Sequence, residues 1–303
     1  MNTFAADPRW GWWIVWYFTL GGIAAGAYFM ACLIELIGGE DDRRLGRVGY
    51  FLAAPLIAVC GVLLILDLDQ PSRFWHMLLD AETWRPHVKW WSPMSIGAWA
   101  LLVFGSISTI SFVGALAESG RRGLGRFAAL ATRIHRGFFG WAFDLSGTVC
   151  GFFIASYTGA LLTATNQPVW SDSPWVAAMF LASSATSGLA AMRLLGDWRG
   201  GIAGESLAKL DRVDGWALGL EICTILLFLS SQRASAAPIF KVPPTWWLLI
   251  GTLVLGAGVP LVLRLAPRRP GRWPHRVAAV LVLAGGFVLR YSILALAPAM
   301  LGR

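Results

Sequence analysis

The most regular pattern along the chain is a series of long apolar stretches separated by short polar connections. Each stretch is close to the ~20 residues that an α-helix needs to cross a bilayer. The stretches run over residues 12–37, 48–66, 93–116, 140–164, 175–195, 213–231, 246–265 and 277–298. The pattern therefore predicts an all-α integral membrane protein with about eight transmembrane helices.

The composition agrees with this pattern, because 56% of the residues are hydrophobic and only 14% are charged. With a mean hydropathy of +0.61, these values exclude a water-soluble globular domain. The longest connections, 67–92 and 117–139, leave almost no sequence for a soluble domain. The short connection at 166–174 divides the helices into two sets, so we expect adjoining four-helix bundles over 1–165 and 166–303.

The basic residues predict the orientation of the protein in the membrane. Of the 25 Lys and Arg residues, 17 fall at the four connections that lie on one side, seven fall on the other side or in the termini, and Arg290 lies inside a helix. Since cytoplasmic loops carry the excess of Lys and Arg, we expect both termini and the 67–92 loop to be extracytoplasmic. The net charge of +8 therefore reflects topology, and no basic stripe with exposed aromatic residues predicts nucleic-acid binding.

A dense polar segment follows the second apolar stretch at residues 67–75, whose sequence is DLDQPSRFW. Asp67, Asp69, Gln70 and Arg73 lie here at the hydrocarbon boundary, and Pro71 stops the preceding helix. Polar groups at this depth are costly unless they serve a function. Carboxylates, an amide and a guanidinium can form a small, wet, proton-exchanging pocket, which would suit the head group of a quinone.

Potential ligands for a metal or haem are few and scattered. No pair of transmembrane helices supplies two facing imidazoles to a haem, and no C-x-x-C sequence predicts a zinc site or an iron–sulfur cluster. The histidines all fall in or beside loops, and the cysteines are widely spaced within apolar stretches: His76, His87, His135 and His275; Cys32, Cys60, Cys150 and Cys223. We therefore expect no haem, iron–sulfur cluster or other metal in this protein.

Ionisable residues at membrane depth include Glu35 and Asp144 near the inner ends of their helices, Glu221 nearer the middle, and Arg290 well inside the last helix. A charge at membrane depth costs roughly 2.5 to 3.5 kcal/mol on insertion scales, so each needs a partner or a function. The three acids are candidates for a proton path. Structural ion pairing, for example between Glu221 and Arg290, is the alternative.

Tyr157 lies in the outer half of the fourth predicted helix, at the depth of the polar segment. Its hydroxyl can donate a hydrogen bond to a quinone carbonyl while its ring packs against the quinone. A buried tyrosine whose hydroxyl is satisfied by a backbone carbonyl is the alternative interpretation.

Several motifs together resemble the NrfD/PsrC-like membrane subunits of polysulfide reductase and related molybdenum oxidoreductases. They are YFTLGGIAAGAY at 17–28, the polar segment at 67–75, SPMSIGAW at 92–99, YTG at 157–159 and GGFVLRY at 285–291. These motifs span almost the whole sequence and occur in the family's order, which makes the match fairly specific.

The resemblance implies a haem-free membrane anchor that exchanges electrons between the quinone pool, as menaquinone or ubiquinone, and its partners. The implied partners are an extracytoplasmic ferredoxin-like subunit with 4Fe–4S clusters and a molybdopterin catalytic subunit. The implied location is the bacterial cytoplasmic membrane, with lipid and quinone around the protein and the quinone site near the outer face. By motif, the quinone-binding residues would be Tyr157, Asp67, Gln70, Arg73, Arg290, Tyr17 and Trp16.

The protein itself would carry no catalytic residue for the substrate reaction, which the resemblance assigns to the partner. Proton translocation through Asp144, Glu221 and Glu35 is a hypothesis, because the family divides on this point.

Two other functions have less support. A secondary transporter would need paired helix breaks in both halves, but the deep prolines, Pro55 and Pro260, occupy helices that do not correspond. A purely structural anchor would need neither the polar segment nor Tyr157.

Overall fold

The computed structural model describes residues 10–119, 137–165, 167–232, 239–265 and 273–300. Within these ranges the protein is helical and has no β-strand, apart from one isolated bridge between Leu79 and Pro86. The helices are α1 (Trp12–Ile37), η1 (Glu40–Asp42), α2 (Arg43–Leu66), η2 (Pro71–Met77), α3 (Pro93–Glu118), α5 (Gly137–Thr163), α6 (Trp175–Arg199), α7 (Gly204–Ser231), α9 (Pro243–Trp246), η4 (Trp247–Gly258), α10 (Val259–Leu265) and α11 (Trp273–Met300).

The described ranges contain eight helices that are long and apolar enough to cross a membrane, and α9, η4 and α10 together form the seventh. The predicted fold class is therefore confirmed. Several helices extend beyond the apolar stretches, as α7 does by starting at Gly204. A helix can continue past the hydrocarbon because its backbone hydrogen bonds do not depend on hydropathy. At this end Ser206 and Lys209 bind Asp42, at 2.6 and 3.1 Å.

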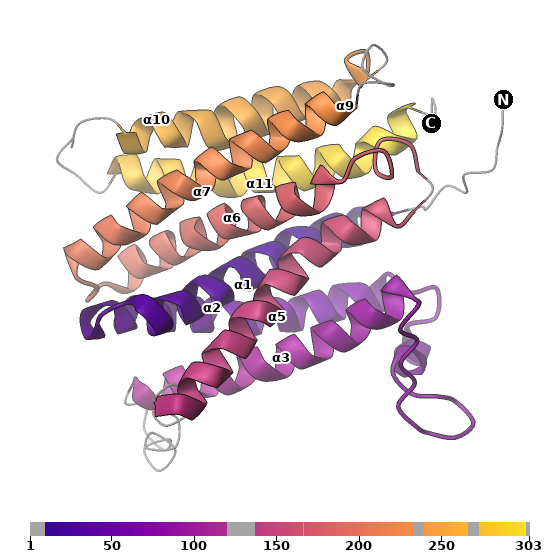
Figure 1. Ribbon diagram of the computed structural model, residues 1–303, viewed down its shortest axis with the longest axis horizontal. Coiled ribbons are helices and arrows are strands. Elements are labelled where there is room, and N and C mark those ends of the chain that lie inside the picture. Colours follow the sequence, from indigo (N-terminus) through magenta and orange to yellow (C-terminus); the bar gives the residue numbers. More distant parts are fainter. Residues whose placement is uncertain (1–9, 120–136, 166, 233–238, 266–272, 301–303) are drawn as a thin grey trace.

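The helices form two neighbouring groups (Figure 1). Within the first group α1 contacts α2 and α5, and α3 contacts both α2 and α5. In the second group α6 contacts α7 and α11, while η4 and α10 pack against α11. The two groups are joined along α1 and α6. The division into separate bundles at residue 165 stays a prediction. The long contact between α1 and α6 joins the two groups.

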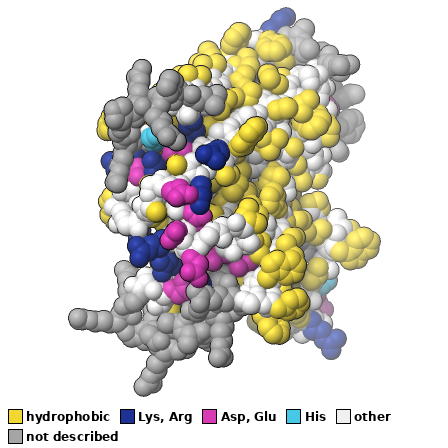
Figure 2. Space-filling model, turned by 60° about the vertical axis from the view of Figure 1, so that its left-hand side comes forward, with side chains coloured by type: hydrophobic (Ala, Val, Ile, Leu, Met, Phe, Trp, Pro, Cys, Tyr) yellow, Lys and Arg dark blue, Asp and Glu magenta, His cyan; other side chains and the backbone are white. Residues whose placement is uncertain are grey.

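Charged and hydrophobic side chains are segregated on the surface. Charged side chains gather at one end of the helices, and hydrophobic side chains cover the flank (Figure 2). The start of α1 and the end of α11 lie at the same end, as an even number of spans requires (Figure 1). Which side of the membrane this end faces stays a prediction from the basic residues; below, "outer" and "inner" follow that prediction.

Small residues bring α1 and α6 into backbone contact. A Cβ at Gly26 would overlap the carbonyl oxygen of Ser184, and one at Gly188 would collide with the backbone of Gly26 and Ala27. In a bilayer, lipid tails are as apolar as the side chains, so helices associate through close packing of this kind. The contact between α1 and α6 therefore requires glycine at both positions.

We expect Gly26→Ala to destabilise the protein by roughly 1–3 kcal/mol, the usual cost of overpacking. The measurement is unfolding in mixed detergent micelles, followed by circular dichroism. Gly61→Ala on α2 is the matched control, because nothing lies within 4 Å of a Cβ built there. Equal stability of the two variants would contradict the importance of this contact.

Candidate functional site

Tyr157 is held between α5 and the first turn of α3. Its hydroxyl donates to the carbonyl oxygen of Pro93 at 2.6 Å, and the residue is 9% exposed. Gly97 makes room for it, because a Cβ there would overlap the phenol ring and hydroxyl. The Ser92 side chain accepts the Ser95 N–H and caps the start of α3. The arrangement places a phenol at the first turn of a helix, where a glycine lets it approach closely.

Tyr17 is a neighbour of Tyr157 from the adjacent helix α1. It is 6% exposed, and its hydroxyl lies within electrostatic range of Tyr157 and of Cys60 on α2. The Cys60 thiol donates a weak hydrogen bond to the Tyr17 carbonyl oxygen at 3.7 Å. Three helices therefore converge on the two phenols. The sequence identified both tyrosines, but it did not identify Cys60 or Gly97, although Gly97 lies within the motif at 92–99.

Asp67 lies at the outer end of α2, where its backbone N–H donates to the carbonyl oxygen of Leu63 at 3.0 Å. It follows Cys60 by seven residues, so the two occupy one face of the helix. Partial burial and the nearby Asp69 carboxylate raise the pKa of Asp67 above its usual value. Asp67 therefore takes up a proton at a higher pH than an ordinary aspartate. Gln70 and Arg73 follow in the loop with exposed side chains.

Arg290 lies behind this site, at the junction of α1, α6 and α11, and is fully buried. Its guanidinium donates to the carbonyl oxygens of Phe18 and Gly286, at 2.9 Å each. It also donates to the hydroxyls of Ser183 and Ser184, at 3.1 and 3.0 Å. Arg290 thus binds α1 at Phe18, the residue after Tyr17. Its hydrogen bonds go to backbone carbonyls and serine hydroxyls of the three helices.

Space for the Arg290 guanidinium comes from α1. A Cβ at Gly22 would collide with the Arg290 guanidinium and with the Ser184 hydroxyl. The Phe180 ring adds a cation–π contact, with its centroid 5.6 Å from the guanidinium carbon. Gly22 of the YFTLGGIAAGAY motif is therefore required by Arg290 of the GGFVLRY motif.

Glu221 is also buried against α6, where its carboxylate accepts a hydrogen bond from Thr186 at 2.8 Å. The carboxylate lies within electrostatic range of the Arg290 guanidinium. Among the described residues, however, Glu221 and Arg290 do not form a direct ion pair. The pairing considered from the sequence is therefore indirect. Each charge is hydrogen-bonded to hydroxyl groups of α6.

Trp16 lies on another side of α1 from Tyr17. Its ring packs against Phe287 of α11, with centroids 4.9 Å apart, and the residue is 45% exposed. Successive residues of an α-helix differ by about 100° in direction, so adjacent positions on α1 serve different surfaces. The structure does not bring Trp16 together with Tyr157.

The other two candidate acids lie in the inner half of the first group. Glu35 pairs with Arg43 at 3.6 Å. Asp144 is buried on α5, and the Tyr50 hydroxyl lies within electrostatic range of both acids. Tyr28 is close by and shares a 2.8 Å hydrogen bond with Ser111. The three candidate acids are thus in two clusters, with Glu221 apart from Glu35 and Asp144.

The sequence reasoning missed a further ionic cluster at the inner ends of α6, α7 and α10. Arg264 pairs with both Asp211 and Asp214, and Asp211 also pairs with Arg193 at 3.3 Å. The apolar stretch begins at residue 213 and leaves Asp211 outside it, so hydropathy alone does not reveal the i, i+3 relation of Asp211 to Asp214. That relation was the available signal.

Histidines and cysteines do not cluster in the described ranges, where no group of three potential metal ligands occurs. His76 and His87 belong to the loop after α2, and the His275 ring lies 3.0 Å from the Asp211 carboxylate. His135 lies outside the described residues. The expectation of no metal or haem in this protein stays a prediction.

The fold and this arrangement define a polytopic membrane protein with a buried arginine and a pair of tyrosines near one face. The family model described as "Polysulphide reductase, NrfD" matches residues 3–301. The protein therefore belongs to the NrfD family, which confirms the resemblance seen in its motifs.

Curated relatives include a polysulfide reductase chain from Wolinella succinogenes, 27% identical over 94% of this protein and 93% of the relative. The protein NrfD of Escherichia coli is 26% identical, with the same coverage of 94% and 93%. A selenate reductase subunit from Mesobacillus selenatarsenatis is 28% identical over 26% of this protein and 18% of the relative.

We expect Arg290→Lys to destabilise the protein, because an ammonium cannot reach the acceptors that the planar guanidinium binds on three helices. Each buried acceptor left without its donor costs about 1–3 kcal/mol. Thermal unfolding in detergent should show a lower midpoint for this variant. Arg73→Lys on the exposed loop is the control and should unfold like the parent; a parent-like Arg290→Lys would contradict the structural role.

Proposed function

We propose that this protein is the quinone-reactive membrane subunit of a respiratory oxidoreductase complex. The observation that carries the proposal is the proximity of Tyr157, held at the first turn of α3, to Tyr17 of α1. Asp67 lies at the outer end of the neighbouring helix α2, on the same helix face as Cys60. Two phenols and a proton-exchanging carboxyl at this depth are the groups that a quinone head requires. In this proposal the catalytic residues for the substrate reaction lie in a partner.

The residues present fit a quinone. Gly97 lets the Tyr157 phenol sit against the start of α3, and Gly21 lies in ordinary contact with Cys60 and the Tyr17 ring, so small residues flank both phenols. We infer that the Tyr157 hydroxyl turns from the Pro93 carbonyl to a quinone carbonyl oxygen, as a phenol that can rotate its O–H allows. A bound quinone, menaquinone or ubiquinone, would supply the two-electron chemistry.

Other residues complete this site in the proposal. Asp67, with its raised pKa, exchanges protons with water at the membrane face. Gln70 and Arg73 organise the loop at its entrance, and Arg290 supports α1 from behind. Trp16 would contribute least to the quinone site, because its ring packs against Phe287 of α11.

The names of the relatives support a role within a complex, since they include a polysulfide reductase chain and a selenate reductase subunit. We infer that the partners are an extracytoplasmic ferredoxin-like subunit with 4Fe–4S clusters and a molybdopterin catalytic subunit. The exposed indoles of the loop after α2, those of Trp84, Trp90 and Trp91, offer a surface for the first of these. The location would be the bacterial cytoplasmic membrane.

Tyr157→Phe should lower quinone-dependent turnover of the intact complex about tenfold, the effect of losing one hydrogen bond worth about 1.5 kcal/mol. Turnover with an artificial dye, which bypasses the membrane subunit, should be unchanged.

Ser156→Ala is the matched control for Tyr157→Phe. It removes a hydroxyl from the preceding residue of α5, where that group binds only its own helix, at Phe152 and Phe153. Parent-like quinone turnover in Tyr157→Phe would remove this tyrosine from the site.

We also propose that Asp144, Glu221 and Glu35 take part in proton transfer from the cytoplasm. Asp144 and Glu221 are buried and Glu35 is partly buried, and tyrosine and threonine hydroxyls lie near them, which supports this role. The proposal rests on the predicted orientation, with these acids in the inner half of the membrane.

Glu221→Gln and Asp144→Asn should each abolish charge movement during turnover while leaving quinone turnover measurable. The measurement is the membrane potential reported by a dye in proteoliposomes that contain the intact complex. Glu205→Gln, an exposed acid at the start of α7, is the control. Charge movement equal to that of the parent in both variants would reject the proton path.

A further inference from the structure

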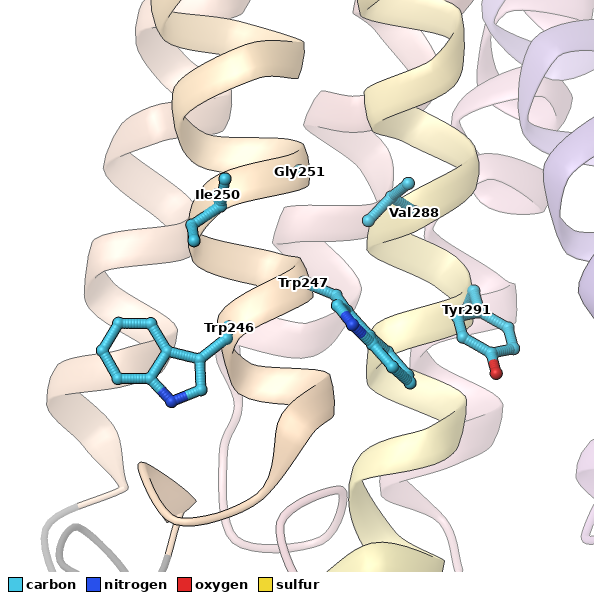
Figure 3. A pocket seen from close by; sticks show the side chains of 6 residues that line it. All are labelled: Trp246, Trp247, Ile250, Gly251, Val288 and Tyr291. Atoms are coloured by element: carbon cyan, nitrogen blue, oxygen red, sulfur yellow. The ribbon is translucent and has the colours of Figure 1, made fainter.

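An apolar groove of about 420 Å³ lies in the outer half of the second helix group, away from the tyrosine pair. It runs between η4 and α11 (Figure 3). Its walls are almost entirely apolar and are formed by Trp246, Trp247, Ile250, Gly251, Val288 and Tyr291. The groove is open to the surface at a depth where the surroundings are hydrocarbon.

Glycines bring η4 and α11 into close contact at several positions along the groove. At Gly256 and Gly285 the two backbones are in direct contact, and Thr252 donates to the Gly285 carbonyl at 3.0 Å. Further out, Gly251 lets the Val288 side chain approach closely, because a Cβ there would lie 2.7 Å from Val288 Cγ1. The helix at this point is a π-helix over Trp247–Gly258.

Aromatic residues with polar groups surround the outer mouth of the groove. The Tyr291 ring stacks on Trp12 and lies beside Trp247, at centroid distances of 5.1 and 5.4 Å. Within the described part of the protein, the Tyr291 hydroxyl and the Trp247 indole N–H form no hydrogen bond. These two donors are available to an acceptor at the interface, where tyrosine and tryptophan have one apolar and one wet side.

A positive charge belongs to the segment that leads into this groove. The Trp246 indole N–H donates to the carbonyl oxygen of Phe240 at 3.1 Å, which brings this segment against the rim. Lys241 follows directly and is exposed. The groove thus combines an apolar slot with two hydrogen-bond donors, and the segment that leads into it carries a cation.

We propose that this groove binds one acyl chain of an anionic phospholipid. The acyl chain lies along Ile250, Gly251 and Val288, the ester carbonyls accept from Trp247 and Tyr291, and the phosphate faces Lys241. A quinone tail has the same hydrocarbon chemistry but no phosphate, so the lysine favours the phospholipid. The lipid would contact both η4 and α11 along the groove that they line.

The test uses the full-length protein in nanodiscs that contain phosphatidylglycerol with a diazirine in one acyl chain. After illumination, mass spectrometry of peptides should place the label on residues 246–251 and 288–291. Val288→Phe, which fills the groove, should remove this label. Val280→Phe, an exposed valine on the same helix outside the groove, is the matched control and should leave it unchanged.

Competition separates the possible occupants. Unlabelled phosphatidylglycerol should displace the label better than phosphatidylcholine, and Lys241→Gln should reduce this preference about fivefold, as expected for one lysine worth about 1 kcal/mol at the lipid surface. Because Lys241 is exposed, this variant does not disturb helix packing. Parent-like labelling of Val288→Phe, equal competition by both lipids, or stronger displacement by an isoprenoid quinone would overturn the proposal.

Discussion

The hydrogen bonds of one buried guanidinium determine how the helices of this protein meet. Arg290 binds the backbone of α1, two hydroxyls of α6 and the carbonyl of Gly286 on its own helix. In hydrocarbon an unpaired arginine would be very costly, so these three helices can pack only where every donor finds an acceptor. The position of α1 set in this way also fixes Tyr17, the residue before the Phe18 acceptor.

The close contact of α1 with α6 follows from the same constraint. Gly22 admits the guanidinium, and Gly26 meets Gly188 backbone to backbone. Since lipid provides no hydrophobic force between helices, such contacts and interhelical hydrogen bonds hold the two groups together. The predicted boundary at residue 165 follows the connectivity of the helices. It does not take account of the contacts between α1 and α6, which stabilise the two groups together.

Hydropathy was sufficient to predict the eight spans, and the cost of polar groups in a membrane singled out Tyr157 and Arg290. Their partners were beyond the reach of the sequence, because a partner depends on how each helix is rotated about its axis. Trp16 and Tyr17 are adjacent in sequence, yet one packs on α11 and the other faces Cys60 and Tyr157. No one-dimensional pattern specifies that rotation. A backbone carbonyl was one of the two partners expected for the Tyr157 hydroxyl, but the sequence could not identify it as that of Pro93.

The indirect relation of Glu221 to Arg290 bears on what the buried acid can do. In a direct ion pair, the arginine would strongly favour the carboxylate form, and proton exchange would have to break the pair. Here Thr186 donates to Glu221, while Ser183 and Ser184 accept from Arg290. A hydroxyl can both donate and accept a hydrogen bond, so α6 stabilises both charges without locking them together. This geometry favours an acid that can change its protonation state over one that serves only to neutralise the arginine.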